Sequence, residues 1–266
     1  MNDALAFVEP VQVQTQRAFL GGERQAGRVR VRLEGGLTQA DFQDVALIGG
    51  GVADQDFRDE ETRALRGRID VALTPDTALF VSAGRTERDF DEATGFATRD
   101  FDQSEALIGA SFDITRLVRG EVGLGYTWAE FADAAQDDLN GFAASTTVEW
   151  FPAEMTTVRL DLRRGVQASG IIGASAFTET AAGLRIDHEL RRNLLLNAEV
   201  GYVQGDFEGL AREDELVRAA VGGDWLVNRI ATLSAQLAHA NQDSTGASRG
   251  RAFDETELTV TATFAR

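Results

Sequence analysis

Residues 158–163 read Val-Arg-Leu-Asp-Leu-Arg, so apolar and charged side chains alternate there without a break. Side chains of a β-strand point alternately to its two faces, which gives such a strand one apolar face and one charged face. The same alternation recurs from about residue 28 to the end of the chain. Clear examples are 65–73, 106–114, 122–128 and 258–264. The pattern predicts an all-β protein of antiparallel strands.

Short and long connections alternate between these segments. The short ones contain Thr74-Pro75-Asp76-Thr77, Thr115-Arg116-Leu117, Pro152-Ala153-Glu154, Leu190-Arg191-Arg192-Asn193 and Val227-Asn228-Arg229. The long ones are acidic, as in 49–61, 91–100, 132–140 and 241–251. This arrangement predicts an antiparallel up-and-down transmembrane β-barrel of about 12 strands (12–14), with short periplasmic turns and long acidic outer loops.

We assign residues 28–266 to the barrel domain and residues 1–27 to an N-terminal segment, in which 11–16 reads as the remnant of an additional strand. The N-terminus lacks the basic segment and long apolar core of a secretory signal. An outer-membrane protein needs such a signal. We therefore expect the sequence to be a processed form or to lack its natural N-terminal portion.

The composition excludes several classes of protein. Of the 266 residues, 43% are hydrophobic and 26% charged, and charged residues interrupt every run long enough for a membrane-spanning helix. A membrane-spanning β-barrel does not need such long apolar runs, because only alternate residues of each strand face lipid. The net charge of −17 argues against non-specific nucleic-acid binding. The absence of cysteine excludes disulfides and thiolate metal sites.

Alternation alone does not say whether the apolar face meets lipid or forms the core of a soluble barrel. Aromatic residues at strand ends favour an apolar face in contact with lipid, because aromatic rings at the level of the headgroups form girdles in membrane barrels. The alternative is that these rings merely close the hairpins of a soluble sheet. The predicted interface aromatics are Phe42, Phe90, Phe101, Tyr126, Trp128, Phe131, Trp150, Phe151, Phe207, Trp225 and Phe253.

Three runs carry a resemblance to a known family: FDITRLVRGEVGLGY at 112–126, EWFPAEMTTV at 149–158 and GLRIDHELRRNL at 183–194. Together they resemble the β-barrel porins of the second type, from about residue 28 to the C-terminus. The resemblance implies a bacterial outer-membrane protein, with relatives that are typically longer. Some relatives are encoded with exopolysaccharide secretion systems, which implies a role in glycan export. Outer-membrane barrels commonly end on an aromatic residue, whereas here Phe264 is followed by Ala265 and Arg266.

No catalytic residue, metal site or cofactor is predicted. His188 and His239 are the only histidines, and neither has a nucleophile and an orienting group at a recognisable spacing, so a structural or interfacial role is favoured over catalysis. Acidic runs such as 54–56, 59–61 and 89–92 offer carboxylates to calcium. None has the spacing of the twelve-residue calcium loop, which favours solvated loops.

The mixed charges of the polar face are the best functional feature. The lumen-facing candidates are Arg66, Arg68, Asp70, Glu149, Arg159, Asp161, Arg163, Arg185, Asp187, Glu199, Arg218 and Asp224. Such charges either tune the passage of solutes or pair and plug a narrow barrel. We expect a passive channel for polar solutes or an accessory of exopolysaccharide export. The alternative is a structural or surface-interaction barrel with a closed lumen. Expected partners are outer-membrane lipid, lipopolysaccharide, the barrel insertion machinery and polysaccharide or small polar solutes, and no nucleic acid.

Overall fold

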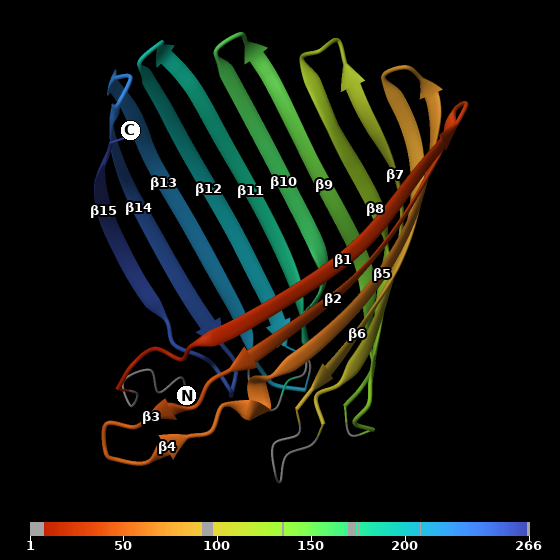
Figure 1. Cartoon of the computed structure of the whole chain (residues 1–266), viewed down its shortest axis with the longest axis vertical. Coiled ribbons are helices and arrows are strands. Elements are labelled where there is room, and N and C mark those ends of the chain that lie inside the picture. Colours follow the sequence, from red (N-terminus) through yellow and green to blue (C-terminus); the bar gives the residue numbers. More distant parts are fainter. Residues whose placement is uncertain are drawn as a thin grey trace.

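The fold is one long antiparallel sheet that curls around an open interior (Figure 1). The computed structural model describes residues 8–91, 98–134, 136–169, 174, 176–207 and 209–264. The sheet holds 13 strands in chain order. They are β1 (Val13–Ala26), β2 (Val29–Phe42), β5 (Glu60–Thr74), β6 (Thr77–Phe90), β7 (Phe101–Ile114), β8 (Val118–Phe131), β9 (Leu139–Ala153), β10 (Thr156–Ala168), β11 (Ala176–Arg191), β12 (Leu194–Phe207), β13 (Glu213–Asn228), β14 (Ala231–Thr245) and β15 (Phe253–Phe264).

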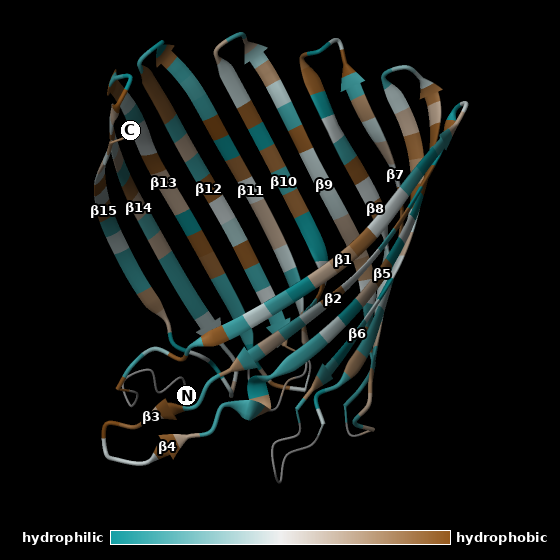
Figure 2. Ribbon diagram, viewed as in Figure 1, coloured by the Kyte–Doolittle hydropathy of each residue, from teal (hydrophilic) through white to brown (hydrophobic). Residues whose placement is uncertain are grey.

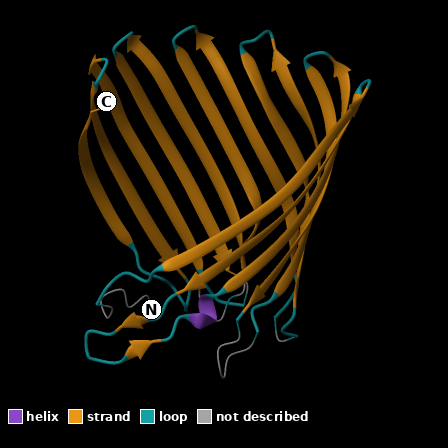
Figure 3. Ribbon diagram, viewed as in Figure 1, coloured by secondary structure: helices purple, strands orange, loops and turns teal. Residues whose placement is uncertain are grey.

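The elements outside this sheet lie in the connection from β2 to β5. They are the two-stranded sheet of β3 (Val45–Ala46) and β4 (Val52–Ala53) and the 3-10 helix η1 (Asp56–Arg58) (Figure 3). Within the described ranges, no helix is long and apolar enough to cross a membrane. The chain is therefore all-β, as the alternation predicted.

Every neighbouring pair of strands in the large sheet is antiparallel and joined by one connection, which is the up-and-down order that the sequence predicted. The predicted short turns lie at one end of the sheet and the long loops at the other (Figure 1). The 13 strands of this sheet lie within the predicted range of 12–14. The strand beyond 12 is β1 (Val13–Ala26), which is complete and pairs with β2 over its whole length. The sheet thus begins within the segment assigned to residues 1–27.

The sheet ends at β1 and β15, which do not pair in the described part of the chain. Val13 at the start of β1 lies opposite Phe42, and Phe253 at the start of β15 lies opposite Gln242, so both strands begin at the long-loop end. The two edge strands consequently run in the same direction. A seam that joined them directly would be parallel, and each edge needs a pairing partner wherever it faces lipid.

One face of the sheet is polar and concave, and the other is apolar and convex. Side chains from strands three apart meet on the concave face, as Arg68 of β5 does with Glu121 of β8. The opposite face carries large apolar side chains in the open, including Val81, Ile108 and Val260, which are 56%, 64% and 62% exposed. Hydrophobic and hydrophilic residues alternate along many of the strands in Figure 2, as expected when the two faces differ in polarity. We call the concave side the inner face and the convex side the outer face.

Two glycines make room for an aromatic ring on the inner face. Phe80 of β6 lies opposite Gly109 of β7, which lies opposite Gly123 of β8. The Phe80 ring covers both glycines and is only 3% exposed. A Cβ on Gly109 would overlap the Phe80 ring and the carbonyl oxygen of Val122. The glycines are therefore required here for close packing.

We expect Gly109→Ala to destabilise the sheet by about 2 kcal/mol, because overpacking forces the ring or the backbone to move. Urea unfolding of the detergent-refolded protein measures the effect. Gly183→Ala is the matched control, since Gly183 is on the inner face of β11 and a Cβ there meets nothing within 4 Å. Equal stability of the two variants would contradict the packing role of Gly109.

Candidate channel lumen

The inner face collects all the charged residues that were predicted to face the lumen. The strand registers place these residues on the same face as Arg68, because residues directly opposite each other on neighbouring strands share a face. Examples of such pairs are Asp70 with Phe80, Ser145 with Arg163 and Arg185 with Glu199. The inner-face residues are Arg66, Arg68, Asp70, Glu149, Arg159, Asp161, Arg163, Arg185, Asp187, Glu199, Arg218 and Asp224.

The most buried of these charges form a cluster around Arg68. Its guanidinium lies 2.8 Å from the Asp70 carboxylate, 2.6 Å from that of Glu121 and 3.8 Å from the centre of the Phe80 ring. Asp70 is only 2% exposed, and its Oδ2 has no hydrogen bond but lies 3.6 Å from Nε of Arg30. A buried carboxylate needs a nearby cation. Arg68 supplies this cation to Asp70 and, through Glu121, ties β5 to β8.

Other inner charges pair in more solvated positions. Arg159 lies 2.8 Å from Asp161 and 3.8 Å from Glu149, and Glu149 also lies 2.6 Å from Arg119. The Arg159 and Asp161 side chains are each 46% exposed. On β11 and β12, Arg185 likewise joins Asp187 and Glu199 at 2.8 Å and 3.1 Å. Such exposed pairs contribute little to stability and remain in contact with water.

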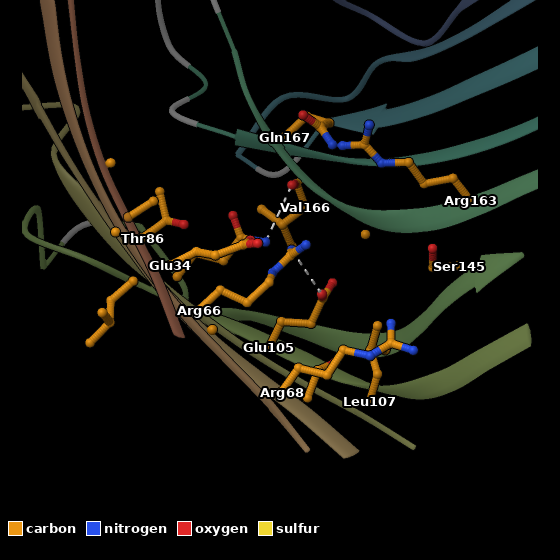
Figure 4. Close-up of a pocket in the computed structure, with 18 of the residues that line it drawn as sticks. Glu34, Arg66, Arg68, Thr86, Glu105, Leu107, Ser145, Arg163, Val166 and Gln167 are labelled. Carbon is orange, nitrogen blue, oxygen red and sulfur yellow. Dashed lines mark hydrogen bonds and ion pairs between the residues drawn. The ribbon is translucent and has the colours of Figure 1, made fainter. Parts of the chain in front are cut away.

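Arg163 and Arg218 are inner cations with no ion pair among the described residues. Arg163 lines a cavity of about 800 Å³ between β1 and β10, together with Arg66 and Glu105 (Figure 4). Arg66 and Glu105 lie 3.9 Å apart there. A second cavity of about 700 Å³ lies toward the short turns and includes Arg119 and Glu149. The interior is thus polar and spacious along the strands.

An apolar cluster narrows the interior at the long-loop end. It comprises Phe90, Phe101, Ala129, Leu139, Val166 and Ala176, with Phe131 and Ala168 partly buried against them. Pairing of β10 with β9 ends at Arg164, whereas its pairing with β11 continues to Ala168. The end of β10 thereby reaches β7, where Nε2 of Gln103 donates to the carbonyl oxygen of Val166 at 3.4 Å.

The interface prediction is wrong for all seven of the strand-end phenylalanines. Tyr126, Trp128, Trp150 and Trp225 do lie on the outer face, 39–49% exposed. By register, Phe42, Phe90, Phe101, Phe131, Phe151, Phe207 and Phe253 belong to the inner face instead. The rings pack inside because the curled ends of the sheet leave space that water would otherwise fill.

Carboxylates in the loops accept hydrogen bonds from the backbone N–H groups of strand-end phenylalanines. Asp59 bonds Phe42 at 2.6 Å, and Asp100 bonds Phe90 at 2.7 Å. These aspartates satisfy backbone donors where the strand ladder ends, so their role is structural.

Neither histidine belongs to a catalytic arrangement in the described residues. Nδ1 of His188 lies 2.9 Å from the Thr156 hydroxyl, and Nδ1 of His239 lies 3.0 Å from that of Thr256. By register both histidines are on the outer face. Their geometry offers hydrogen bonds between neighbouring strands and no activated nucleophile.

The acidic loop after β2 brings carboxylates of Asp44, Asp54 and Asp56 within 4.8 Å of one another. Asp54 and Asp44 also accept backbone hydrogen bonds from Asp56 and Gln55. Repulsion from the Asp54 carboxylate raises the pKa of Asp56 above its ordinary value. All three residues are exposed, which fits the solvated loop favoured from the sequence.

Comparisons with known proteins agree with this architecture. Among solved structures, the FrpB iron transporter from Neisseria meningitidis (F3-3 variant) matches with a TM-score of 0.60 and 10% identity, over 89% of this chain and 44% of that chain. The copper transporter OprC matches with a TM-score of 0.56 and 14% identity, over 96% of this chain and 50% of that chain. The outer membrane transporter YddB from Escherichia coli matches with a TM-score of 0.55 and 9% identity, over 89% of this chain and 42% of that chain.

The chain spans half or less of the length of these structures, and identities this low indicate a shared fold alone. No curated protein matches the sequence. The fold and the polar inner face are those of the wall of an outer-membrane β-barrel, and β1 and β15 do not pair to close it among the described residues. A family model described as "Putative beta-barrel porin 2" matches residues 1–266, and the chain belongs to that family. The resemblance noted in the sequence is thereby confirmed.

We expect Arg68→Leu to destabilise the protein by about 3 kcal/mol, since it leaves the buried Asp70 without its nearest cation. Arg159→Leu is the control, because it breaks a pair of solvated side chains and should cost less than about 1 kcal/mol. Urea unfolding in detergent micelles measures both. A loss as small as that of Arg159→Leu would contradict the structural role of Arg68.

We expect Asp56→Asn to slow amide hydrogen exchange in this loop at about pH 7. At about pH 3, below the ordinary aspartate pKa, the substitution should have no effect on the exchange. Because folding raises the pKa of Asp56, its contribution to stability is present at low pH and is lost as the pH rises through the folded-state pKa. Amide hydrogen exchange over residues 52–59 reports the difference. Asp76→Asn, in a short turn at the other end of the sheet, should leave this exchange unchanged.

Proposed function

We propose that this chain forms the wall of a passive outer-membrane channel for polar solutes. The observation that supports the proposal is the convergence of arginines and carboxylates on the inner face around a cavity of about 800 Å³. Rings of charge tune which ions and solutes enter a pore. Lipid and lipopolysaccharide would surround the apolar outer face, and the barrel insertion machinery would assemble it.

A closed-lumen structural barrel is the second candidate. The apolar cluster around Phe101 and Val166 favours it, because dry side chains at one end obstruct water and ions. The paired charges also suit a plug, since Arg68 and Glu121 tie together two strands that are not neighbours. In this case the acidic loops would be the functional part, as a surface for other molecules.

Single-channel recording in planar bilayers separates the two candidates. The sample is the refolded protein whose folded state has been verified by heat-dependent migration on gels. Stepwise current would support the channel, and folded protein without current would support the closed barrel. If current is seen, a neutral oligosaccharide added to one side tests the exopolysaccharide alternative, because a glycan conduit would show transient block.

We expect Arg163→Glu to shift the reversal potential in a salt gradient toward greater cation selectivity. Arg163 lines the cavity without a carboxylate partner among the described residues, so its charge is free to act on passing ions. Arg85→Glu is the control, because Arg85 lies on the outer face, paired with Asp102 at 2.6 Å. Equal shifts in both variants would rule out a lumen effect.

A further inference from the structure

A small pocket at the long-loop end of the inner face concentrates positive charge. It has a volume of about 210 Å³ and is lined by Phe42, Arg58, Glu60, Arg88, Phe90, Arg99, Ala168 and Ser169. Its walls come from β2, η1, β5, β6 and the end of β10, together with Arg99 just before β7. We call it the loop-end arginine pocket. Three guanidinium groups and a single carboxylate, that of Glu60, line it.

The three arginines differ from most arginines of the inner face in having no ion pair. No carboxylate of the described residues lies within 4.0 Å of the charged nitrogens of Arg58, Arg88 or Arg99. Arg99 donates to the carbonyl oxygens of Phe57 at 2.6 Å and Ser169 at 3.5 Å, and Arg58 donates to the side chain of Gln55 at 3.3 Å. Their hydrogen-bond partners are therefore neutral.

Arg88 is the least satisfied of the three. Its Nε is fully shielded from solvent and has no hydrogen-bond partner among the described residues. A buried donor without a partner costs about 1–3 kcal/mol, and more when it is charged. An anionic group in the pocket would supply the missing acceptor.

Phenylalanine rings fix the orientation of these guanidinium groups. The Arg58 carbon Cζ lies 4.3 Å from the centre of the Phe42 ring, that of Arg99 4.3 Å from the Phe90 ring, and that of Arg88 5.7 Å from the Phe101 ring. Stacking holds a guanidinium plane in place and removes water from one side of it. Burial lowers the pKa of Arg99, but a guanidinium remains protonated at any physiological pH.

The neighbouring aspartates do not neutralise the pocket. Asp59 and Asp100 accept hydrogen bonds from the backbone N–H groups of Phe42 and Phe90, and neither lines the cavity. The pocket is therefore cationic in a chain whose net charge is −17. An excess of positive charge at one place in an acidic protein indicates recognition of an anion.

We propose that the loop-end arginine pocket binds a phosphate group at the outer mouth of the barrel. Guanidinium groups bind phosphate with parallel hydrogen bonds, and a phosphate offers enough oxygens to serve three arginines at once. The volume equals that of roughly seven water molecules, so a phosphate with a short organic stem fits. The phosphate belongs either to a soluble phosphorylated solute or to the lipid A headgroup. This site does not depend on whether the lumen conducts.

Isothermal titration calorimetry of the refolded wild-type protein tests the proposal with three probes: inorganic phosphate, glycerol 3-phosphate and lipid A in detergent micelles. Glycerol is the uncharged control. Binding of the two soluble phosphates supports a solute site, and binding of lipid A alone supports a lipid headgroup at the same arginines. Folded protein that binds none of the three overturns the proposal.

Substitutions locate the binding. Arg88→Gln and Arg99→Gln should each weaken binding at least tenfold, and Arg58→Gln provides a third variant in case either of these fails to refold. Arg85→Gln is the matched control, since Arg85 lies in β6 near Arg88 but on the outer face with carboxylate partners. Undiminished binding in the folded pocket variants, or an equal loss in Arg85→Gln, would place the phosphate elsewhere.

Discussion

The structure depends on one constraint, which is that a β-strand in lipid must satisfy every backbone hydrogen bond through its neighbours and can show lipid only alternate side chains. The continuous registers of the sheet meet the first requirement between β1 and β15. The second requirement, that only alternate side chains face lipid, gives the sheet an apolar outer face and places the charged side chains on the inner face. Since no water-filled space is available on the lipid side, ion pairs and solvated arginines gather where the sheet curls around its interior.

Much of this was predictable because the signals are local. Alternation with a period of two fixes which residues share a face, and that placed Asp70, Arg163 and Glu199 correctly on one side. Turn residues such as Pro75 and Asp76 mark the short hairpins. β1 was only partly recognised, because Gln14 and Gln16 occupy its outer face and weaken the apolar signal.

The remainder depends on contacts between strands that are far apart in sequence. A shift of one residue at a strand end sends an aromatic ring inward or outward, so Phe90 and Phe101 were assigned to the lipid interface although they pack inside. The inward path of the end of β10 has no local signal. The clustering of Arg58, Arg88 and Arg99 has no local signal either, because these residues come from separate parts of the chain. They stack on phenylalanine rings that the sequence pattern had assigned to the membrane interface.

The most direct test of lipid contact by the outer face uses the three native tryptophans, Trp128, Trp150 and Trp225, which all lie on that face. The refolded protein is reconstituted in vesicles of dibrominated phosphatidylcholine, whose bromine atoms quench tryptophan fluorescence on contact within the acyl chains. If the outer face lies against lipid, most of the fluorescence is lost relative to vesicles of the unbrominated lipid. Unchanged fluorescence in protein shown to be folded and inserted would mean that the apolar face does not meet lipid.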